Sequence, residues 1–107
     1  MSTAPKSEVL NVTSLVEYQP GSVVSRQITK AEGGNVTLFA FDEGQELSEH
    51  TVPFDALVHV LDGEAEIKIS GQPSLLKAGE AIIMPANQPH AVKAVKKFKM
   101  LLTMIKT

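Results

Sequence analysis

The chain contains no cysteine, and this absence removes several classes of protein from consideration. Disulfide-stabilised folds, zinc sites built from thiolates and enzymes with a thiol nucleophile all require cysteine. A chain of 107 residues is nevertheless long enough to bury one core without disulfides or a structural metal. We therefore expect a single domain. The lack of cysteine is also consistent with the reducing environment of the cytoplasm.

Long apolar runs and an excess of charge of one sign are lacking too. No apolar segment approaches the roughly 18 residues that a membrane-spanning helix requires. The first residues lack the basic start and apolar run of a signal peptide. The formal net charge of −2 gives no electrostatic reason to expect nucleic acid as a partner. We expect a cytoplasmic protein that binds neither a membrane nor a nucleic acid.

What the chain has in abundance is hydrophobic alternation with a period of two, which is typical of strands. The Asp62-Gly63 pair, between two alternating runs, predicts a hairpin because both residues tolerate positive φ. Short strands separated by turn signals predict an all-β sandwich or barrel. We expect a flexible segment at 1–7, one barrel domain at 8–107, and either an edge strand or a covering arm at 9–16. The predicted strands are residues 23–29, 36–41, 74–76, 81–84, 90–95 and 98–105.

Several predicted strands are apolar on both faces, although a small barrel needs only one apolar face per strand. Leu38 and Ala40 alternate with Phe39 and Phe41, for example, and the strand at 98–105 shows the same pattern. The outward apolar face must therefore be covered. A second copy of the chain is the simplest cover, so we expect a homodimer. The alternative is coverage by the N-terminal arm.

Glycine, histidine and proline recur at fixed distances in two parts of the chain. In order, these residues are Gly44, His50, Gly63, Gly79, Pro85 and His90. Their spacing resembles the two sequence motifs of the cupin superfamily, over about half of the chain. The resemblance implies an all-β double-stranded β-helix, or jelly-roll, barrel. Two positions depart from the second motif, since Asn87 replaces its glycine and Ala94 replaces its asparagine.

The first motif departs from the family at the residues that matter most for chemistry. In cupins, two histidines and a glutamate of the first motif and the histidine of the second bind one metal inside the barrel. Here His50 and His90 match the first and last of these ligands. Val52 occupies the position of the second histidine, and Ala56 that of the glutamate. The resemblance therefore implies a site with only His50 and His90 left as metal ligands.

Strand alternation indicates which other side chains could complete this set. His50, Val52 and Ala56 share the inward parity, whereas Asp55 and His59 point outward. Asp55 is the first candidate for a replacement ligand, because a bulge at residues 52–54 would change the register. We expect His59 to face a subunit interface or to lie half-buried on the outer surface.

Whether a metal binds at all is left open by the residues themselves. Two neutral imidazoles leave the charge of a divalent cation unbalanced inside an apolar barrel, where desolvation is expensive. The candidate ions are Fe, Ni, Mn, Cu and Zn. Val52, Ala56, Met84 and Met100 would line a mostly apolar pocket around the two histidines.

Two functions fit these residues, and both remain open. The first is binding of a small molecule in the apolar pocket, with His50 and His90 orienting a polar group of the ligand. The second is a metal-dependent enzyme, of dioxygenase or isomerase type, whose two-histidine site leaves positions open for a chelating substrate. No Ser-His-Asp set, phosphate-binding loop or carboxylate pair is recognisable. The cupin fold itself implies no particular reaction.

Overall fold

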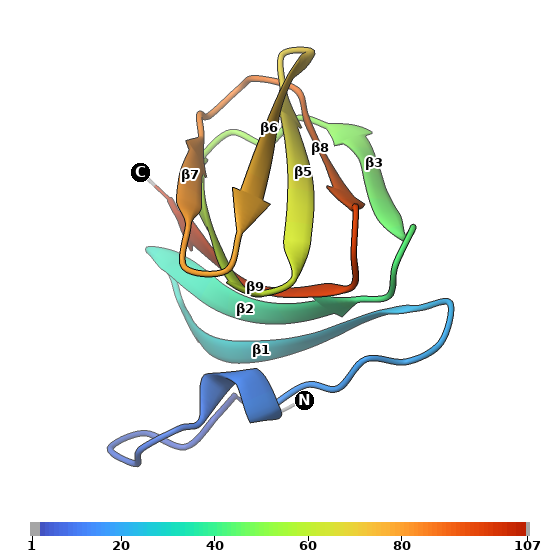
Figure 1. The fold of residues 1–107 in the computed structure, drawn as a ribbon. Helices are drawn as coiled ribbons and strands as arrows, with labels where there is room; N and C mark the ends of the chain where they lie inside the picture. Colours follow the sequence, from blue (N-terminus) through green and yellow to red (C-terminus); the bar gives the residue numbers. More distant parts are fainter. Residues whose placement is uncertain (1–2, 107) are drawn as a thin grey trace.

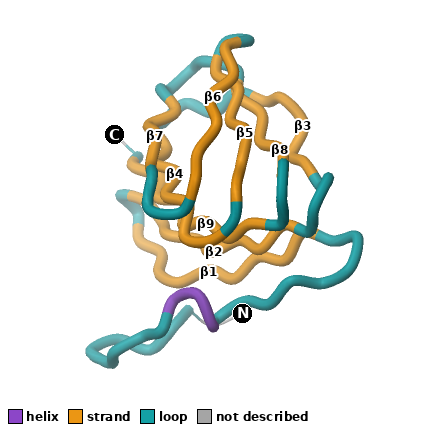
Figure 2. The backbone as a smooth tube through the Cα atoms, viewed as in Figure 1, coloured by secondary structure: helices purple, strands orange, loops and turns teal. Residues whose placement is uncertain are grey.

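The computed structural model describes residues 3–106 and is built almost entirely of antiparallel strands and loops (Figures 1 and 2). A five-stranded sheet has the order β1-β2-β9-β4-β7, and a four-stranded sheet has the order β3-β8-β5-β6. The two sheets enclose one core, as expected for a barrel. The elements are η1 (Val12–Ser14), β1 (Val23–Ala31), β2 (Gly34–Phe41), β3 (Glu46–His50), β4 (Asp55–Asp62), β5 (Glu64–Ile69), β6 (Gln72–Lys77), β7 (Ala81–Met84), β8 (His90–Ala94) and β9 (Phe98–Ile105).

The predicted all-β fold is confirmed, and each predicted strand matches an observed one to within two residues at either end. The strand that alternation missed is β3. It is short, and its register against β8 shifts between Leu47 and His50. Such a bulge interrupts the period of two by which a strand is recognised. Within residues 3–106, no helix is long and apolar enough to cross a membrane.

The hairpin predicted at Asp62-Gly63 is wrong. The strands on either side, β4 and β5, lie in different sheets, and the turn carries the chain from one sheet to the other. Alternation shows that a strand ends and another begins, but not which sheet the next strand joins. A true hairpin links β5 to β6 through Ser70 and Gly71, which both have positive φ, and it pairs Ile69 with Gln72.

The core is formed by inward side chains from both sheets. Phe41 of β2 and Phe98 of β9 are paired across the sheet and fully buried. Their rings stack with centroids 4.6 Å apart and planes inclined by 16°. Ile67 of β5 is also fully buried and belongs to the same core cluster. The end of the barrel near Phe98 is therefore filled by large side chains.

The N-terminal segment covers part of the outer face of the five-stranded sheet (Figure 1). Val16 is buried in a second cluster with Leu38 and Ala40 of β2, and Leu61 and Leu101 pack against that cluster. Residues 9–16 contain the short helix η1 and no strand. Of the two expectations for this segment, the arm is therefore correct and the edge strand is wrong.

Tyr18, at the end of this N-terminal arm, bonds the arm to the barrel. Its hydroxyl donates a 2.6 Å hydrogen bond to Oδ2 of Asp62. Burial and this hydrogen bond raise the pKa of Tyr18 well above its usual value. The ammonium groups of Lys97 and Lys99 lie 4.9 and 5.1 Å from the centroid of the tyrosine ring, within the range of a cation–π contact.

The flexible segment expected at 1–7 falls partly outside the described residues, which begin at residue 3. Ala4 is buried, and its N–H donates a 2.9 Å hydrogen bond to the carbonyl of Ile28. The division of the chain at residue 8 stays a prediction.

Replacing Gly63 with alanine should lower the free energy of unfolding more than the same change at Gly71. The φ angles are alike, 78° and 82°, so each variant carries a left-handed strain of about 1–2 kcal/mol. A Cβ at Gly63 would overlap the carbonyl oxygen of Lys97, whereas a Cβ at Gly71 would meet nothing within 4 Å. We expect Gly63→Ala to cost a further 1–3 kcal/mol, roughly the cost of overpacking.

Urea denaturation of both variants and the unmodified protein measures this difference. Equal losses of stability in the two variants would contradict the close approach of Gly63 to the β8–β9 connection.

Candidate functional site

His50 and His90 form a cross-strand pair between β3 and β8. Their ring centroids are 4.4 Å apart, and the rings meet edge to face at 69°. The bulge in β3 produces this arrangement, because the extra residue after Leu47 allows Leu47 and His50 to face the same cavity. The pairing brings together two imidazoles that are forty positions apart in sequence.

His50 lies at the accessible side of the pair. The side chain is exposed, and its Nδ1 is 2.9 Å from the carbonyl oxygen of Ser48. A carbonyl can only accept, so Nδ1 of the neutral ring carries the proton and Nε2 has a free lone pair. This hydrogen bond to the backbone also fixes the orientation of the ring.

His90 lies inside and has only 3% of its surface exposed. Its Nδ1 is buried and forms no hydrogen bond with any described residue. Burial lowers the pKa of His90, and repulsion from a charged His50 lowers it further; a weaker interaction of the ring with the backbone of Gln88, whose geometry does not make it a hydrogen bond of Nδ1, opposes this with a smaller effect. His90 is therefore held as a neutral imidazole with one polar atom unsatisfied, which is an unfavourable state in a buried site.

The two histidines border a cavity of about 30 Å³ between the sheets. This volume holds about two water molecules, since one requires roughly 10–15 Å³. The six residues expected to form the site lie together around it, and four further side chains complete the lining. The complete lining is Leu47, His50, Val52, Ala56, Met84, His90, Val92, Met100, Leu102 and Met104. Its only nitrogen or oxygen side-chain donors are the imidazoles.

A simple signal could have identified three of the four further residues, and Met104 was already a candidate for the core or the pocket wall. Val92 follows His90 by two positions, and Leu102 and Met104 follow Met100 with the same period. Inward parity therefore extends the site along β8 and β9. Leu47 had no such signal. It lies three positions before His50, so simple alternation places the two on opposite faces, and only the bulge brings both to the cavity.

The residues present do not fit the divalent metal that the four-ligand motif would hold. Among residues 3–106, no group of three or more histidine, cysteine, aspartate or glutamate side chains could bind an ion. Ala56, at the glutamate position, lies between Met84 and Met104 in the sheet. Asp55, the expected replacement ligand, is engaged elsewhere: its Oδ1 accepts a 2.8 Å hydrogen bond from the N–H of Ala86.

The remaining candidate residues have structural explanations. Asn87 has φ 65°, a left-handed conformation that asparagine adopts more readily than most residues, so it can replace the glycine of the second motif. Its N–H donates a 2.8 Å hydrogen bond to the carbonyl of Val52, which joins the two loops beside the histidines. His59 pairs with Ala81 and Leu101 on the outer face, away from His50.

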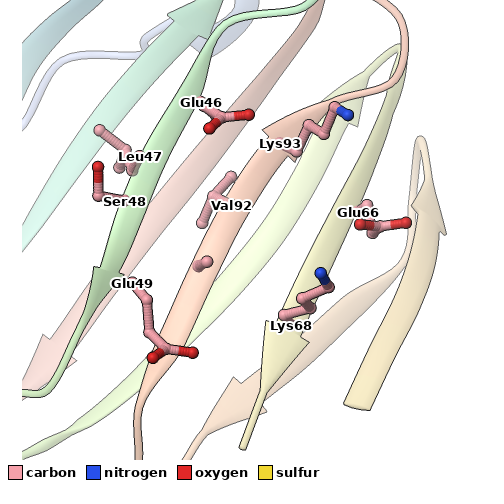
Figure 3. A pocket seen from close by; sticks show the side chains of 9 residues that line it. Glu46, Leu47, Ser48, Glu49, Glu66, Lys68, Val92 and Lys93 are labelled. Atoms are coloured by element: carbon pink, nitrogen blue, oxygen red, sulfur yellow. The ribbon is translucent and has the colours of Figure 1, made fainter. Parts of the chain in front are cut away.

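A second hollow, of about 130 Å³, lies on the outer face of the four-stranded sheet (Figure 3). Charged side chains surround it, among them Glu46, Glu49, Lys68 and Lys93. It is open to solvent, and both signs of charge are represented. The hollow is a shallow polar surface and does not contain the histidine pair.

The cupin domain family matches residues 37–106 of the chain, which include β3, β8 and the whole cavity lining. The chain belongs to the cupin family. No curated protein matches it. At the four positions that hold metal ligands in the family motif, this cupin has His50, Val52, Ala56 and His90.

Solved structures agree with this assignment. A conserved protein of unknown function from Streptococcus pyogenes is 36% identical, with 100% of this chain and 96% of that chain covered and a TM-score of 0.91. A cupin 2 conserved barrel domain protein from Leptotrichia buccalis is 42% identical over 91% of this chain and 47% of its own, with a TM-score of 0.88. A cupin superfamily protein from Desulfitobacterium hafniense is 28% identical over 99% and 97%, with a TM-score of 0.91.

Restoring both missing ligands should create a divalent metal site in this cupin. The Val52→His/Ala56→Glu variant supplies the absent imidazole and carboxylate, so we expect its affinity for Ni²⁺ or Zn²⁺ to rise at least about tenfold. Ala56 is only 1% exposed, so a glutamate there should destabilise the metal-free protein, and bound metal should reverse the loss.

Isothermal titration and thermal melting with and without metal measure the two effects, and Val52→His alone is the matched control. If the double variant binds metal no better than the unmodified protein, the missing ligands are not what weakens the site.

Proposed function

We propose that this cupin is a binding protein whose barrel cavity takes a small, mostly apolar molecule through a polar group held by His50 and His90. The observation that carries the proposal is the buried, unpartnered Nδ1 of His90 beside the exposed imidazole of His50. An otherwise apolar cavity with a few convergent polar groups is the usual form of a small-molecule site.

The protonation of the pair limits the kind of polar group. The free Nε2 of His50 is an acceptor, because Nδ1 donates to Ser48. His90 is held neutral by burial, which lowers its pKa. A neutral group that donates a hydrogen bond, such as a hydroxyl, suits this pair better than an anion, whose charge would be poorly compensated among apolar side chains.

The size of the cavity limits the apolar part. A volume of about 30 Å³ excludes any organic molecule larger than a few atoms unless the lining moves. Met84, Met100 and Met104 can provide that movement, because methionine is unbranched and adapts its shape at low cost. We therefore expect the ligand to displace thioether side chains as it enters.

A metal-dependent enzyme of dioxygenase or isomerase type is the second candidate. One observation favours it: the hydrogen bond from Nδ1 of His50 to a backbone carbonyl is the support that metal-binding histidines usually have. The substrate would have to supply the remaining donors, including the negative charge that Ala56 no longer provides.

Short-chain alcohols are suitable probes of the binding proposal. Titration of protein labelled at the methionine methyl groups with 1-propanol and 2-methylpropanol should give saturable shifts for Met84 and Met104, observed by NMR. His90→Leu should weaken this binding about tenfold, the loss expected when a hydrogen bond to a buried partner is removed. His59→Leu, on the outer face, is the control.

Saturable shifts of equal affinity in the unmodified protein and in His90→Leu would contradict the anchoring role of the histidine pair. Absence of any saturable shift with either alcohol would contradict the binding proposal itself.

We also propose that two copies of this cupin associate through the outer face of β4 and β7. Leu57 and Ile83 are paired neighbours there and are 37% and 60% exposed. Ile105, at the end of β9, is 54% exposed. The arm packs against the opposite part of the same sheet, around Leu38 and Ala40, so it does not account for these side chains. Their neighbours His59, Ala81 and Thr103 carry no permanent charge, as expected of an interface core, whereas Asp55, which pairs with Ile105, is charged.

Light scattering should give twice the chain mass, and Ile83→Glu should shift the protein to the monomer. Leu75→Glu is the matched control, since Leu75 is 53% exposed on β6 of the other sheet. A monomer mass that does not change with concentration in the unmodified protein would contradict the dimer.

A further inference from the structure

Three methionine side chains line the same cavity as the two histidines. Met84 comes from β7, and Met100 and Met104 come from β9, so all three belong to the five-stranded sheet. His50 and His90 belong to the four-stranded sheet that faces it. The cavity therefore has methionine side chains on one wall and imidazoles on the other. Every one of these potential donors is neutral when the histidines are unprotonated.

From this arrangement we propose that the cavity binds a soft monovalent metal cation, Cu(I) or its redox-inert analogue Ag(I), between the imidazoles and the thioethers. Thioether sulfur is a soft ligand that favours Cu(I), and imidazole also binds copper well. The inference concerns the same cavity as the proposed function but does not depend on the organic ligand; it adds a second class of ligand.

Charge decides between this cation and the divalent ions of the complete cupin motif. A divalent ion inside an apolar cavity needs an anionic ligand to compensate its desolvation, and the lining contains none. The desolvation free energy of an ion rises with the square of its charge, so a monovalent ion of similar size loses far less. Neutral donors are therefore sufficient for Cu(I) where they are insufficient for Fe²⁺ or Zn²⁺.

The positions of the side chains favour the same ion. Ala56 pairs with Met84 on one side and Met104 on the other, so the smallest side chain of the lining lies between two thioethers. On the facing wall, Nδ1 of His90 is buried without a partner, and the side chain is 3% exposed. A cation in the cavity would give this buried imidazole a polar partner. The cavity of about 30 Å³ is large enough for an ion without its hydration shell.

Anaerobic titration with Cu(I) in competition with bicinchoninate, and with Ag⁺ in chloride-free buffer, tests the inference. We expect binding of one equivalent and a clear preference for both ions over Zn²⁺. Met84→Leu/Met104→Leu, which preserves side-chain volume, should weaken Cu(I) and Ag⁺ binding at least about tenfold and leave weak Zn²⁺ binding unchanged. His59→Leu, which removes an imidazole outside the cavity, should have no effect.

A second measurement avoids the risk that the double variant misfolds. Protein containing selenomethionine keeps the shape of the cavity, and X-ray absorption at the selenium edge after addition of Ag⁺ should reveal a silver neighbour. Cu(I) or Ag⁺ affinity unchanged by the methionine substitutions, tighter binding of Zn²⁺, or no silver near selenium would each overturn the inference.

The alcohol titration distinguishes this inference from the proposed function. If 1-propanol binds at the histidine pair but neither Cu(I) nor Ag⁺ does, the cation site is wrong and the organic-ligand proposal stands. If the cations bind through methionine but the alcohols do not, the cation site stands and the organic-ligand proposal is wrong.

Discussion

The stacked rings of Phe41 and Phe98 are the contact on which the interior of this barrel depends. They lie on neighbouring strands, are fully buried and fill the space between the sheets at one end. At that end Gly63 passes so close to the backbone of Lys97 that no side chain fits. Because sheets pack at a nearly constant separation, the small side chain of Ala56 leaves a space toward the other end, among the larger side chains that line the cavity.

Val52 and Ala56 stand at two positions where the family has metal ligands. This difference changes the chemistry of the cavity but not its place in the barrel. The fold still brings His50 and His90 together across β3 and β8. Without a carboxylate the site has no permanent negative charge, and burial keeps His90 neutral by lowering its pKa. Neutral nitrogen donors, soft sulfur donors and apolar walls then determine what can bind.

The outer face of the five-stranded sheet has two apolar regions, and they differ in whether another part of the chain covers them. Near β1 and β2 the N-terminal arm covers the apolar side chains, and Tyr18 holds it there through Asp62. Near β4 and β7 the side chains of Leu57 and Ile83 remain exposed. The arm therefore covers one region of this face, and the other region is the one for which we propose a second copy of the chain.

By itself, the sequence determined the all-β class, the position of most strands and the family, because hydrophobic period and glycine and histidine spacing are local properties of the chain. It also showed that Val52 and Ala56 stand at ligand positions. Only the tertiary structure decided that Asp62-Gly63 joins two sheets instead of closing a hairpin, since pairing between strands depends on contacts distant in sequence. The same is true of the bulge that directs Leu47 and His50 to one cavity, of Asp55 bonding to Ala86, and of the methionines that face the histidines. Each of these depends on where two separate segments meet, which no local pattern encodes.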